Sequence, residues 1–422
     1  MAKIVVTGEG FDPGRPVRLS FLGQQLGKVK ADDTGAFRAR VRIPSSAQPG
    51  EATLSAVEHG GLSADAVFTV RTDWPMFRFA LDRTGVNPYE NTLSPANVAG
   101  LSIKWSTDLG YPLGSAPILV DGVVYEGDVG GTLFALEATS GAALWQINLG
   151  NQGVANPVVT GGLVYAGTNA NGTLVAVDAS SGQIVWEKDL GGGVFDSPAV
   201  ASGRLYIGSN DGNLYALDAA NGTTLWTAAV RPSTSVAYRD GVLYVGTWDQ
   251  RVFALDATAG SVLWRSPPLV GLIDSTPALS KTLLFVGTTN FAPYRVYGID
   301  VASGSIVWNR TVAGTVTASP AVVDGAVYVA DGSGTLSAFG EADGASVWNS
   351  RLGGVLAGSP TVANGVLYVD STTGSLYAID LAGQELWTYA TGGEVISSIA
   401  VTDGVAYVGS FDRFLYAFGL GS

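Results

Sequence analysis

The sequence predicts an all-β protein: an eight-bladed β-propeller with four antiparallel strands per blade, preceded by a small β-sandwich. Three observations lead to this fold. A tryptophan recurs every 38 to 44 residues, the same order of short apolar runs and turns precedes most recurrences, and the first seventy residues follow a different, strand-like pattern. The recurring tryptophans are Trp105, Trp145, Trp186, Trp226, Trp264, Trp308, Trp348 and Trp387.

Residues 197–226 illustrate the repeated unit. A short strand, a two-residue turn, a second strand, a longer turn, a third strand and a loop lead to the strand that carries the tryptophan. Four strands in about forty residues make one propeller blade. Pairs such as Asp121-Gly122 and Asn364-Gly365 suit the type I′ turn of the first hairpin. The tryptophans are therefore expected to be structural and to dock against the neighbouring blade.

The number of strands predicts how the ring closes. Trp105 precedes all eight sets of first, second and third strands, and no tryptophan strand follows the last set. We therefore expect the strand around Trp105 to complete the blade whose other strands lie in residues 398–418. The N- and C-terminal segments of the propeller would then share one blade.

Composition divides the chain into three parts. Residues 1–71 alternate between apolar and polar positions and are broken by Gly, Pro and Asp, which predicts a β-sandwich. Residues 72–104 have no clear period but carry Trp74, Phe77, Phe79 and Tyr89, so we expect a linker that docks on a domain surface. Residues 105–422 form the propeller.

The charge and the rare residue types limit the chemistry. Residues 1–72 carry a charge of +2 and the remainder −15, giving the net charge of −13, so nucleic acid and anionic membranes are not expected as partners. The chain has no cysteine and a single histidine, His59, expected in a solvent-facing turn of the first module. A Ser-His-Asp triad or a histidine metal site on the propeller is thereby excluded. We find no apolar run long enough to span a membrane and no signal peptide in the sequence.

Two resemblances to known families follow from these motifs. The third strand and its exit, as in YALDAANGTTLW and FALDATAGSVLW, are similar to the tryptophan-docking repeat of the PQQ-like propeller superfamily, named after pyrroloquinoline quinone. This resemblance covers residues 74–419. In the first module, GEGFDPGRPVRLSFLGQQLGKVKADDTGAFRARVRIP resembles the immunoglobulin-like modules found beside bacterial cell-surface domains.

The propeller resemblance implies a cofactor that this sequence does not match. Quinone dehydrogenases of the superfamily hold the quinone against a disulfide between neighbouring cysteines, with Glu, Asn and Asp around a calcium ion in long insertions. This chain has no cysteine, and its short intervals leave no room for the insertions. We assign no catalytic, cofactor-binding or metal-binding residue. The loop of residues 209–213 offers oxygen atoms for calcium but lacks the ligand count of an EF-hand.

The candidate binding residues are those that break the repetition. The loops that enter the first strand of a blade, and those between its second and third strands, share one face of a propeller. Most blades carry small residues there, whereas the third to fifth blades carry aromatic and charged ones. The candidates for partner binding are Phe195, Asp196, Arg231, Trp248, Asp249, Asp274, Phe291 and Tyr294. Ile273 is a further unusual residue in these loops, and Glu394, Phe411 and Arg413 are exceptions among the other blades, near the closure.

The sequence favours a non-catalytic binding or scaffolding protein of the bacterial cell envelope or surface. By resemblance it is expected to be extracellular or periplasmic and to bind a protein, with a glycan as a further candidate and no direct insertion into a membrane. Two alternatives stay open. One is an enzyme, either quinone-dependent or cleaving glycosides with paired carboxylates such as Asp196, Asp274 and Glu394. The other is the extracellular sensor region of a longer signalling protein.

Overall fold

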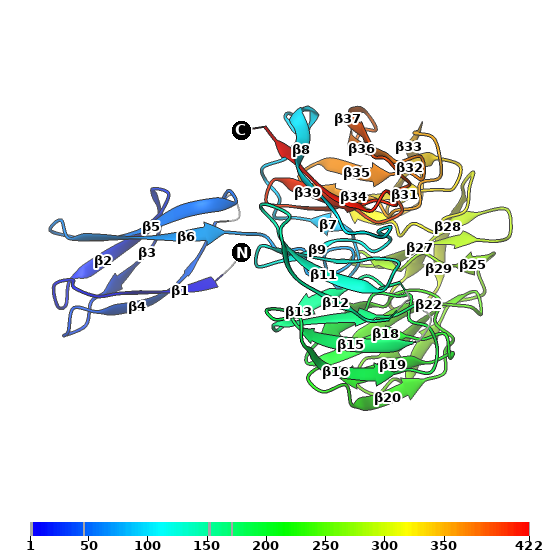
Figure 1. Cartoon of the computed structure of the whole chain (residues 1–422), viewed down its shortest axis with the longest axis horizontal. Coiled ribbons are helices and arrows are strands. Elements are labelled where there is room, and N and C mark those ends of the chain that lie inside the picture. Colours follow the sequence, from blue (N-terminus) through cyan, green and yellow to red (C-terminus); the bar gives the residue numbers. More distant parts are fainter. Residues whose placement is uncertain (1–2, 45–46, 151–152, 170–171, 422) are drawn as a thin grey trace. The chain divides into compact units, whose positions relative to one another are not determined.

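A computed structural model describes residues 3–44, 47–150, 153–169 and 172–421. The chain divides into two compact units, Met1–Thr72 and Asp73–Ser422 (Figure 1). Among the described residues, no helix is long and apolar enough to cross a membrane. Each unit is described by itself.

The first unit is a two-layered β-structure. One sheet pairs two strands and the other has the order β3-β2-β5-β6. The apolar side chains that alternate along β2 pack with Phe37 and Val41 of the two-stranded sheet, so both sheets contribute to one core. His59 is exposed in the turn after β5. The strands are β1 (Lys3–Gly8), β2 (Pro16–Phe21), β3 (Gln24–Lys30), β4 (Phe37–Arg42), β5 (Gly50–Glu58) and β6 (Ser63–Val70).

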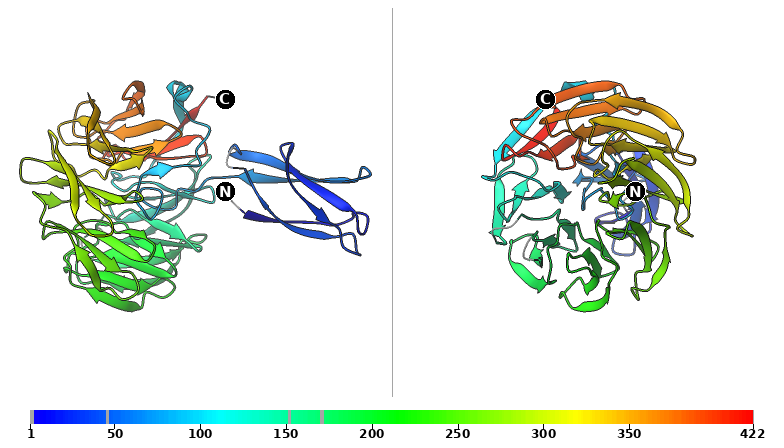
Figure 2. Two further views of the ribbon diagram at one scale, coloured as in Figure 1. Left: turned by 180° about the vertical axis from the view of Figure 1, so that it is seen from behind. Right: turned by 90° about the vertical axis from the view of Figure 1, so that its right-hand side faces the viewer.

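The second unit is a β-propeller, as predicted. In its described residues, eight sheets of four or five strands are arranged around a common centre (Figure 2). First strands of neighbouring sheets contact one another around most of the ring, and the contact between β38 and β9 joins the eighth sheet to the first. We number these sheets as blades in chain order.

The strands of the first four blades are β9 (Ile118–Val120), β10 (Val123–Gly127), β11 (Thr132–Glu137) and β12 (Ala143–Asn148); β13 (Val158–Thr160), β14 (Leu163–Gly167), β15 (Thr173–Asp178) and β16 (Ile184–Asp189); β17 (Ala199–Ala201), β18 (Arg204–Gly208), β19 (Leu214–Asp218) and β20 (Thr224–Ala228); and β21 (Ala237–Arg239), β22 (Val242–Thr247), β23 (Arg251–Asp256) and β24 (Val262–Arg265).

The strands of the last four blades are β25 (Leu272–Ile273), β26 (Ala278–Leu279), β27 (Leu283–Thr289), β28 (Arg295–Asp300) and β29 (Ile306–Thr311); β30 (Ala321–Val323), β31 (Ala326–Ala330), β32 (Thr335–Gly340) and β33 (Ser346–Arg351); β34 (Thr361–Ala363), β35 (Val366–Asp370), β36 (Ser375–Asp380) and β37 (Glu385–Ala390); and β38 (Ala400–Thr402), β39 (Val405–Gly409) and β40 (Phe414–Leu420). The connecting segment contributes β7 (Val86–Asn87), the 3-10 helix η1 (Val98–Gly100) and β8 (Leu101–Asp108).

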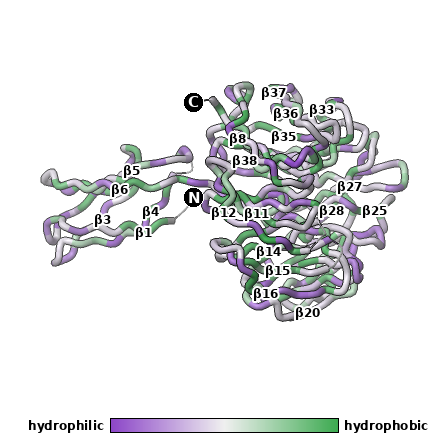
Figure 3. The backbone as a smooth tube through the Cα atoms, in the orientation of Figure 1, coloured by the Kyte–Doolittle hydropathy of each residue, from purple (hydrophilic) through white to green (hydrophobic). Residues whose placement is uncertain are grey.

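Strand burial follows position in the blade. The second strands are almost wholly buried, as the pattern of β14 illustrates, whereas outermost strands such as β12 are exposed at most positions. In Figure 3, hydrophobic stretches follow strands such as β14 and β15. Blade five departs from the regular repeat, because the loop that enters it forms the extra strand β25 against the end of β27.

The ring closes as the strand count predicts. The outermost strand of the eighth blade is β8, which precedes the first blade in sequence and pairs antiparallel with β40. Trp105 lies opposite Ala417 in this pairing. The two ends of the propeller are thus held by one sheet.

Each of the eight recurring tryptophans bridges two blades. Its indole Nε1–H donates to a backbone carbonyl of the following blade at 2.8 to 3.2 Å. The indole ring of Trp308 packs against Gly344, where a larger residue would not fit: a Cβ on Gly344 would lie 2.6 Å from this indole ring. The φ of +67° at Gly344 favours glycine independently. The acceptors are the carbonyls of Ala138, Ala179, Ala219, Ala257, Val301, Glu341, Leu381 and Leu101.

A segment that we call the strap, residues 73–87, runs along the first strands of the blades. Trp74 forms two backbone hydrogen bonds with Leu119 of β9, and further main-chain carbonyls of the strap accept from other blades in turn. Two side chains of the strap bond to the third and eighth blades: Arg83 donates to the carbonyl of Pro198 at 2.9 Å, and Asn87 donates to the carbonyl of Val401 at 2.8 Å. The other contacts are Pro75 with Val159, Leu81 with Tyr238, Asp82 with Leu279, Thr84 with Val322 and Gly85 with Val362. The strap therefore contacts every blade.

Two buried arginines anchor the strap. Arg78 is 1% exposed and Arg83 is fully buried, and both donate to backbone carbonyls, Arg78 to Pro320 and Pro360 and Arg83 also to Val236. Burial lowers the pKa of Arg78 to about 9 and that of Arg83 to about 10, so both stay charged at neutral pH. Of the aromatic residues expected to dock, Trp74 and Phe77 are buried, whereas Tyr89 is exposed.

Replacing Trp308 tests the interblade contact. Trp308 is 5% exposed, so we expect Trp308→Ala to lower the free energy of unfolding by about 3–5 kcal/mol, through lost packing and an orphaned carbonyl. The measurement is equilibrium unfolding in urea. Val307→Ala is the control, since Val307 is 51% exposed on the same strand, and it should cost less than about 1 kcal/mol. Equal losses for the two variants would contradict the docking role.

Candidate functional site

The candidate residues lie in loops that the fold brings together at one end of each blade. The loop entering a blade forms bridges to the loop between its second and third strands, as between Val154 and Thr168 or between Pro232 and Thr247. We call the surface formed by these two sets of loops the loop face. It carries all eight candidates predicted for partner binding.

The structure brings three of these candidates together. Arg231 Nη1 lies 2.6 Å from Asp249 Oδ1, and the backbone N–H of Trp248 donates to the carbonyl of Arg231 at 3.0 Å. Arg231 N–H in turn donates to Gly212 of the third blade, so backbone bonds connect three neighbouring loops. The indole of Trp248 is 43% exposed although its backbone is held in place. Such a pre-positioned aromatic side chain is typical of binding hot spots.

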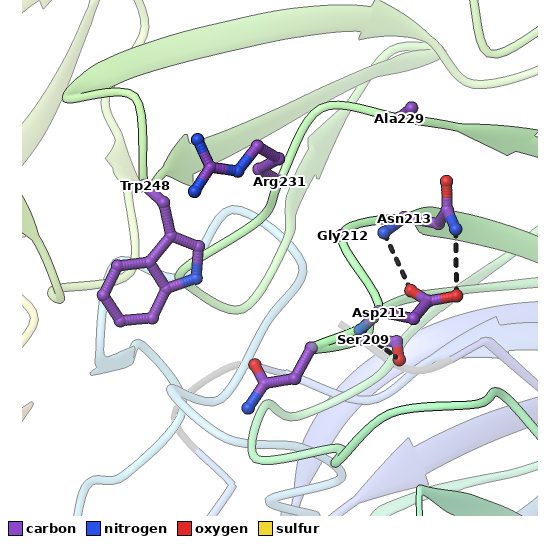
Figure 4. Close-up of a pocket in the computed structure, with 8 residues that line it drawn as sticks. Ser209, Asp211, Gly212, Asn213, Ala229, Arg231 and Trp248 are labelled. Carbon is purple, nitrogen blue, oxygen red and sulfur yellow. Dashed lines mark hydrogen bonds between the residues drawn. The ribbon is translucent and has the colours of Figure 1, made fainter.

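A groove of about 570 Å³ adjoins these residues (Figure 4). Asp211 lies on its third-blade side and accepts hydrogen bonds from the backbone N–H of Asn213 at 2.8 Å, from Asn213 Nδ2 at 2.9 Å and from the Tyr215 hydroxyl. Burial works against ionisation of Asp211, but the bonds from Tyr215 and Asn213 outweigh it and lower its pKa. The groove is lined by Ser209, Asn210, Asp211, Gly212, Asn213, Ala229, Arg231 and Trp248.

The groove combines an aromatic face with fixed polar groups of both signs. Asp211 is ionised at neutral pH, and Arg231 is 62% exposed at its side chain, so its pair with Asp249 contributes about 1 kcal/mol or less to stability. In the loop of residues 209–213, whose oxygens suit calcium by sequence, both carboxylate oxygens of Asp211 accept hydrogen bonds from neighbouring residues. In the described part of the chain, no three His, Cys, Asp or Glu side chains are grouped to hold a metal ion.

The other candidates lie outside this groove, on other loops. Phe195 and Phe291 are each 56% exposed, Phe195 beside a different, smaller pocket and Phe291 in the loop after β27. Tyr294 is partly buried in the same loop, and Glu394 is exposed. Ile273 is fully buried in the interface of the fourth and fifth blades, so it offers no surface to a partner.

Asp196 interacts electrostatically with Arg83 of the strap and with Asp274. Burial raises the pKa of Asp196 to about 6; the Ser235 hydroxyl and the Arg83 guanidinium oppose this rise, and the charge of Asp274 adds to it. Asp274 accepts a hydrogen bond from the Thr289 hydroxyl. Neither carboxylate is among the residues that line the groove beside Trp248.

Two buried carboxyl groups escaped the sequence interpretation. Glu126 and Asp370 are fully buried, and burial raises the pKa of each well above its ordinary value. The sequence does mark these two positions as unusual in the repeat. Where the first blade has Glu126, the other blades carry apolar residues such as Ile207 and Val245. Where the seventh blade has Asp370, most blades carry glycine. Both residues lie on second strands, β10 and β35, outside the loops that carry the candidate residues.

The tryptophan-docked sheets define a propeller of the PQQ-like repeat class. Matches to the family model described as outer membrane protein assembly factor BamB cover residues 97–172, 166–270, 249–351 and 292–419. The chain belongs to this family.

Individual relatives agree with this assignment. The chain is 30% identical over 275 residues to outer membrane protein assembly factor BamB of Salmonella typhimurium, a match that covers 59% of each protein. BamB from Moraxella catarrhalis has a similar structure, with a TM-score of 0.65 at 21% identity over 76% of this chain and 99% of that one. Quinohemoprotein alcohol dehydrogenase from Comamonas testosteroni has a TM-score of 0.70 at 15% identity, over 83% and 81% of the two chains. At these identities the structures share the fold.

Replacing Asp196 tests its electrostatic setting. The pKa of about 6 in the folded chain exceeds the ordinary value of 3.8, so the folded protein binds the proton more tightly and its stability falls as the pH rises from about 4 to about 6. We expect Asp196→Asn to remove this loss and to stabilise the protein by about 1–3 kcal/mol at pH 8, with little effect at pH 4. Urea unfolding at pH 4 and pH 8 measures this change in the free energy of unfolding. An equal change at the two pH values would contradict the raised pKa of Asp196.

Proposed function

We propose that this chain is a non-catalytic scaffold of the bacterial cell envelope that binds a protein partner through the loop face of its third to fifth blades. Membership of the family supports the general part of this proposal. The relatives from Salmonella and Moraxella are both named BamB, and the Salmonella protein is named an outer membrane protein assembly factor. A periplasmic or cell-surface location belongs to the same proposal.

The observation that carries the binding surface is the exposure of large aromatic side chains on positioned loops. Trp248 and Phe291 are 43% and 56% exposed, on neighbouring blades. Burial of such side chains by a partner supplies binding free energy, and backbone hydrogen bonds around Trp248 reduce the entropy lost on binding. The ionised groups of the groove would add orientation and specificity.

A quinone-dependent oxidation is the competing function that the dehydrogenase neighbour raises. The residues present do not fit a quinone with a calcium ion. The chain has no cysteine to form the disulfide of the quinone enzymes, and the space along the first strands is taken by the strap with the side chains of Arg78 and Arg83. We therefore assign no quinone-dependent reaction to this chain.

The test replaces the exposed aromatic residues together. We expect Trp248→Ser, Phe291→Ser and Tyr294→Ser, combined in one chain, to abolish capture of the envelope protein that co-purifies with the unaltered chain. Quantitative mass spectrometry of cross-linked envelope extracts measures the capture.

The control variant changes three apolar residues on outermost strands, Val185→Ser, Leu225→Ser and Val347→Ser, which are 45% to 63% exposed away from the loop face. It should retain the partner. Capture that survives the loop-face changes, with both variants folded, would refute the proposed surface.

A further inference from the structure

A second pocket on the loop face lies where the eighth blade meets the first three. It has a volume of about 190 Å³ and shares no lining residue with the groove beside Trp248. Ser115 and Asp128 contribute side chains that are 2% and 1% exposed, whereas Phe195 at its edge is 56% exposed. The pocket thus combines buried polar groups with an apolar rim, to which Ile396 and Phe411 also belong.

Asp128, one of the residues that line this pocket, has a carboxylate oxygen with no hydrogen-bond partner among the described residues. Asp128 Oδ1 accepts from the backbone N–H of Thr132 at 2.7 Å, while Oδ2 is buried with no hydrogen-bond partner among the described residues. None of the ion pairs found in the described part of the chain includes Asp128. A buried oxygen of this kind costs free energy until a donor reaches it.

Two polar side chains that line the pocket are bonded within the protein. The Ser115 hydroxyl donates to Glu126 and accepts from the backbone N–H of Gly127 at 2.9 Å. Asn156 Oδ1 accepts from the backbone N–H of Ala116 at 2.6 Å. Burial raises the pKa of Glu126 well above its ordinary value, and Glu126 Oε2 is also buried with no hydrogen-bond partner among the described residues. The residues that line the pocket include Asp128 and not Glu126, so Asp128 is the carboxyl group placed to meet a ligand.

The electrostatics select a positively charged ligand. The Asp128 side chain is buried, so the protein around an ionised Asp128 screens its charge less than water does, and a positively charged group is attracted to it more strongly. Arg413, two residues after Phe411, is paired with Asp108 at 3.2 Å. Aromatic rings such as Phe195 and Phe411 add cation–π attraction at the rim.

Size and composition favour an organic cation over a metal ion. A cavity of about 150 Å³ holds a benzene ring, so this pocket has room for a short carbon chain with a charged end. The described residues contain no three grouped carboxylates, histidines or cysteines for a metal. The apolar rim residues would contact the carbon chain of such a cation, and the buried carboxylate of Asp128 would accept a hydrogen bond from its charged end.

We infer that this pocket binds an alkylammonium or alkylguanidinium group, whose charged end donates to Asp128 and whose carbon chain contacts the apolar rim. The side chain of a lysine or arginine in a bound protein has this chemistry, and so has a free amine. The inference concerns binding by the chain itself, at a pocket that shares Phe195 with the partner surface proposed for the third to fifth blades.

The test titrates the full chain with n-butylammonium, n-butylguanidinium and n-butanol by isothermal titration calorimetry. We expect saturable binding of the two cations and none of the alcohol. Asp128→Asn, which keeps the acceptor for Thr132, should weaken cation binding by about tenfold or more.

Asp331→Asn provides the matched control. Asp331 occupies the same turn in the sixth blade and is 2% exposed, but both of its oxygens accept hydrogen bonds, from Ser333, Thr335 and Gly314. This variant should bind the cations as the unaltered chain does. Absence of saturable cation binding, equal binding of butanol, or equal weakening by the two variants would overturn the inference.

A further pair of probes separates the sources of the cation. The unaltered chain is titrated with 1,4-diaminobutane and with a blocked Gly-Lys-Gly peptide. Tighter binding of the peptide assigns the pocket to a protein side chain, and tighter binding of the diamine assigns it to a free amine. A lack of binding by both would count against the site.

Discussion

The indole N–H of one blade and a backbone carbonyl of the next hold the ring together. In seven interfaces the acceptor lies 31 to 37 residues beyond the tryptophan, near the exit of the third strand of the following blade. A buried indole with an unpaired N–H would be costly, so the spacing of tryptophan and carbonyl constrains the length of every repeat. A tyrosine of the second strand often shares the same carbonyl, as Tyr165 does with Trp186 at Ala219.

The eighth interface shows what happens where the chain ends meet. Trp387 donates to Leu101, at the start of the closing strand, instead of to a turn within a continuous blade. The Tyr368 hydroxyl, which would share a carbonyl in a regular interface, is buried with no partner among the described residues, and burial raises its pKa. The strap compensates by connecting all blades through their first strands. Closure by β8 and the strap are thus two independent constraints on the same ring.

The fold could be predicted because its main determinant is a sequence period. Tryptophan spacing predicted the propeller, and the strand that precedes the first set predicted the closure through Trp105. Arg78 and Arg83 could not be recognised as anchors, because their partners are backbone carbonyls, which carry no sequence signal. Of the candidate site, Arg231, Trp248 and Asp249 are joined in the structure as one group. Asp128 could not be recognised, because its role depends on which oxygen its own turn leaves unpaired. Asp211 lies in the loop of residues 209–213, whose oxygens suit calcium by sequence, but both of its carboxylate oxygens accept hydrogen bonds from Asn213.

Hydrogen exchange at the indole nitrogens would test the interblade contact most directly. The chain has ten tryptophans, whose indole N–H signals can be resolved by NMR after assignment by single substitution. If the interblade bonds hold the ring, the eight docked indoles will exchange slowly and at a common rate set by cooperative opening, while the exposed indole of Trp248 exchanges fast. If the eight docked indole N–H groups exchanged as fast as that of Trp248, the central role assigned to the interblade hydrogen bonds would be contradicted.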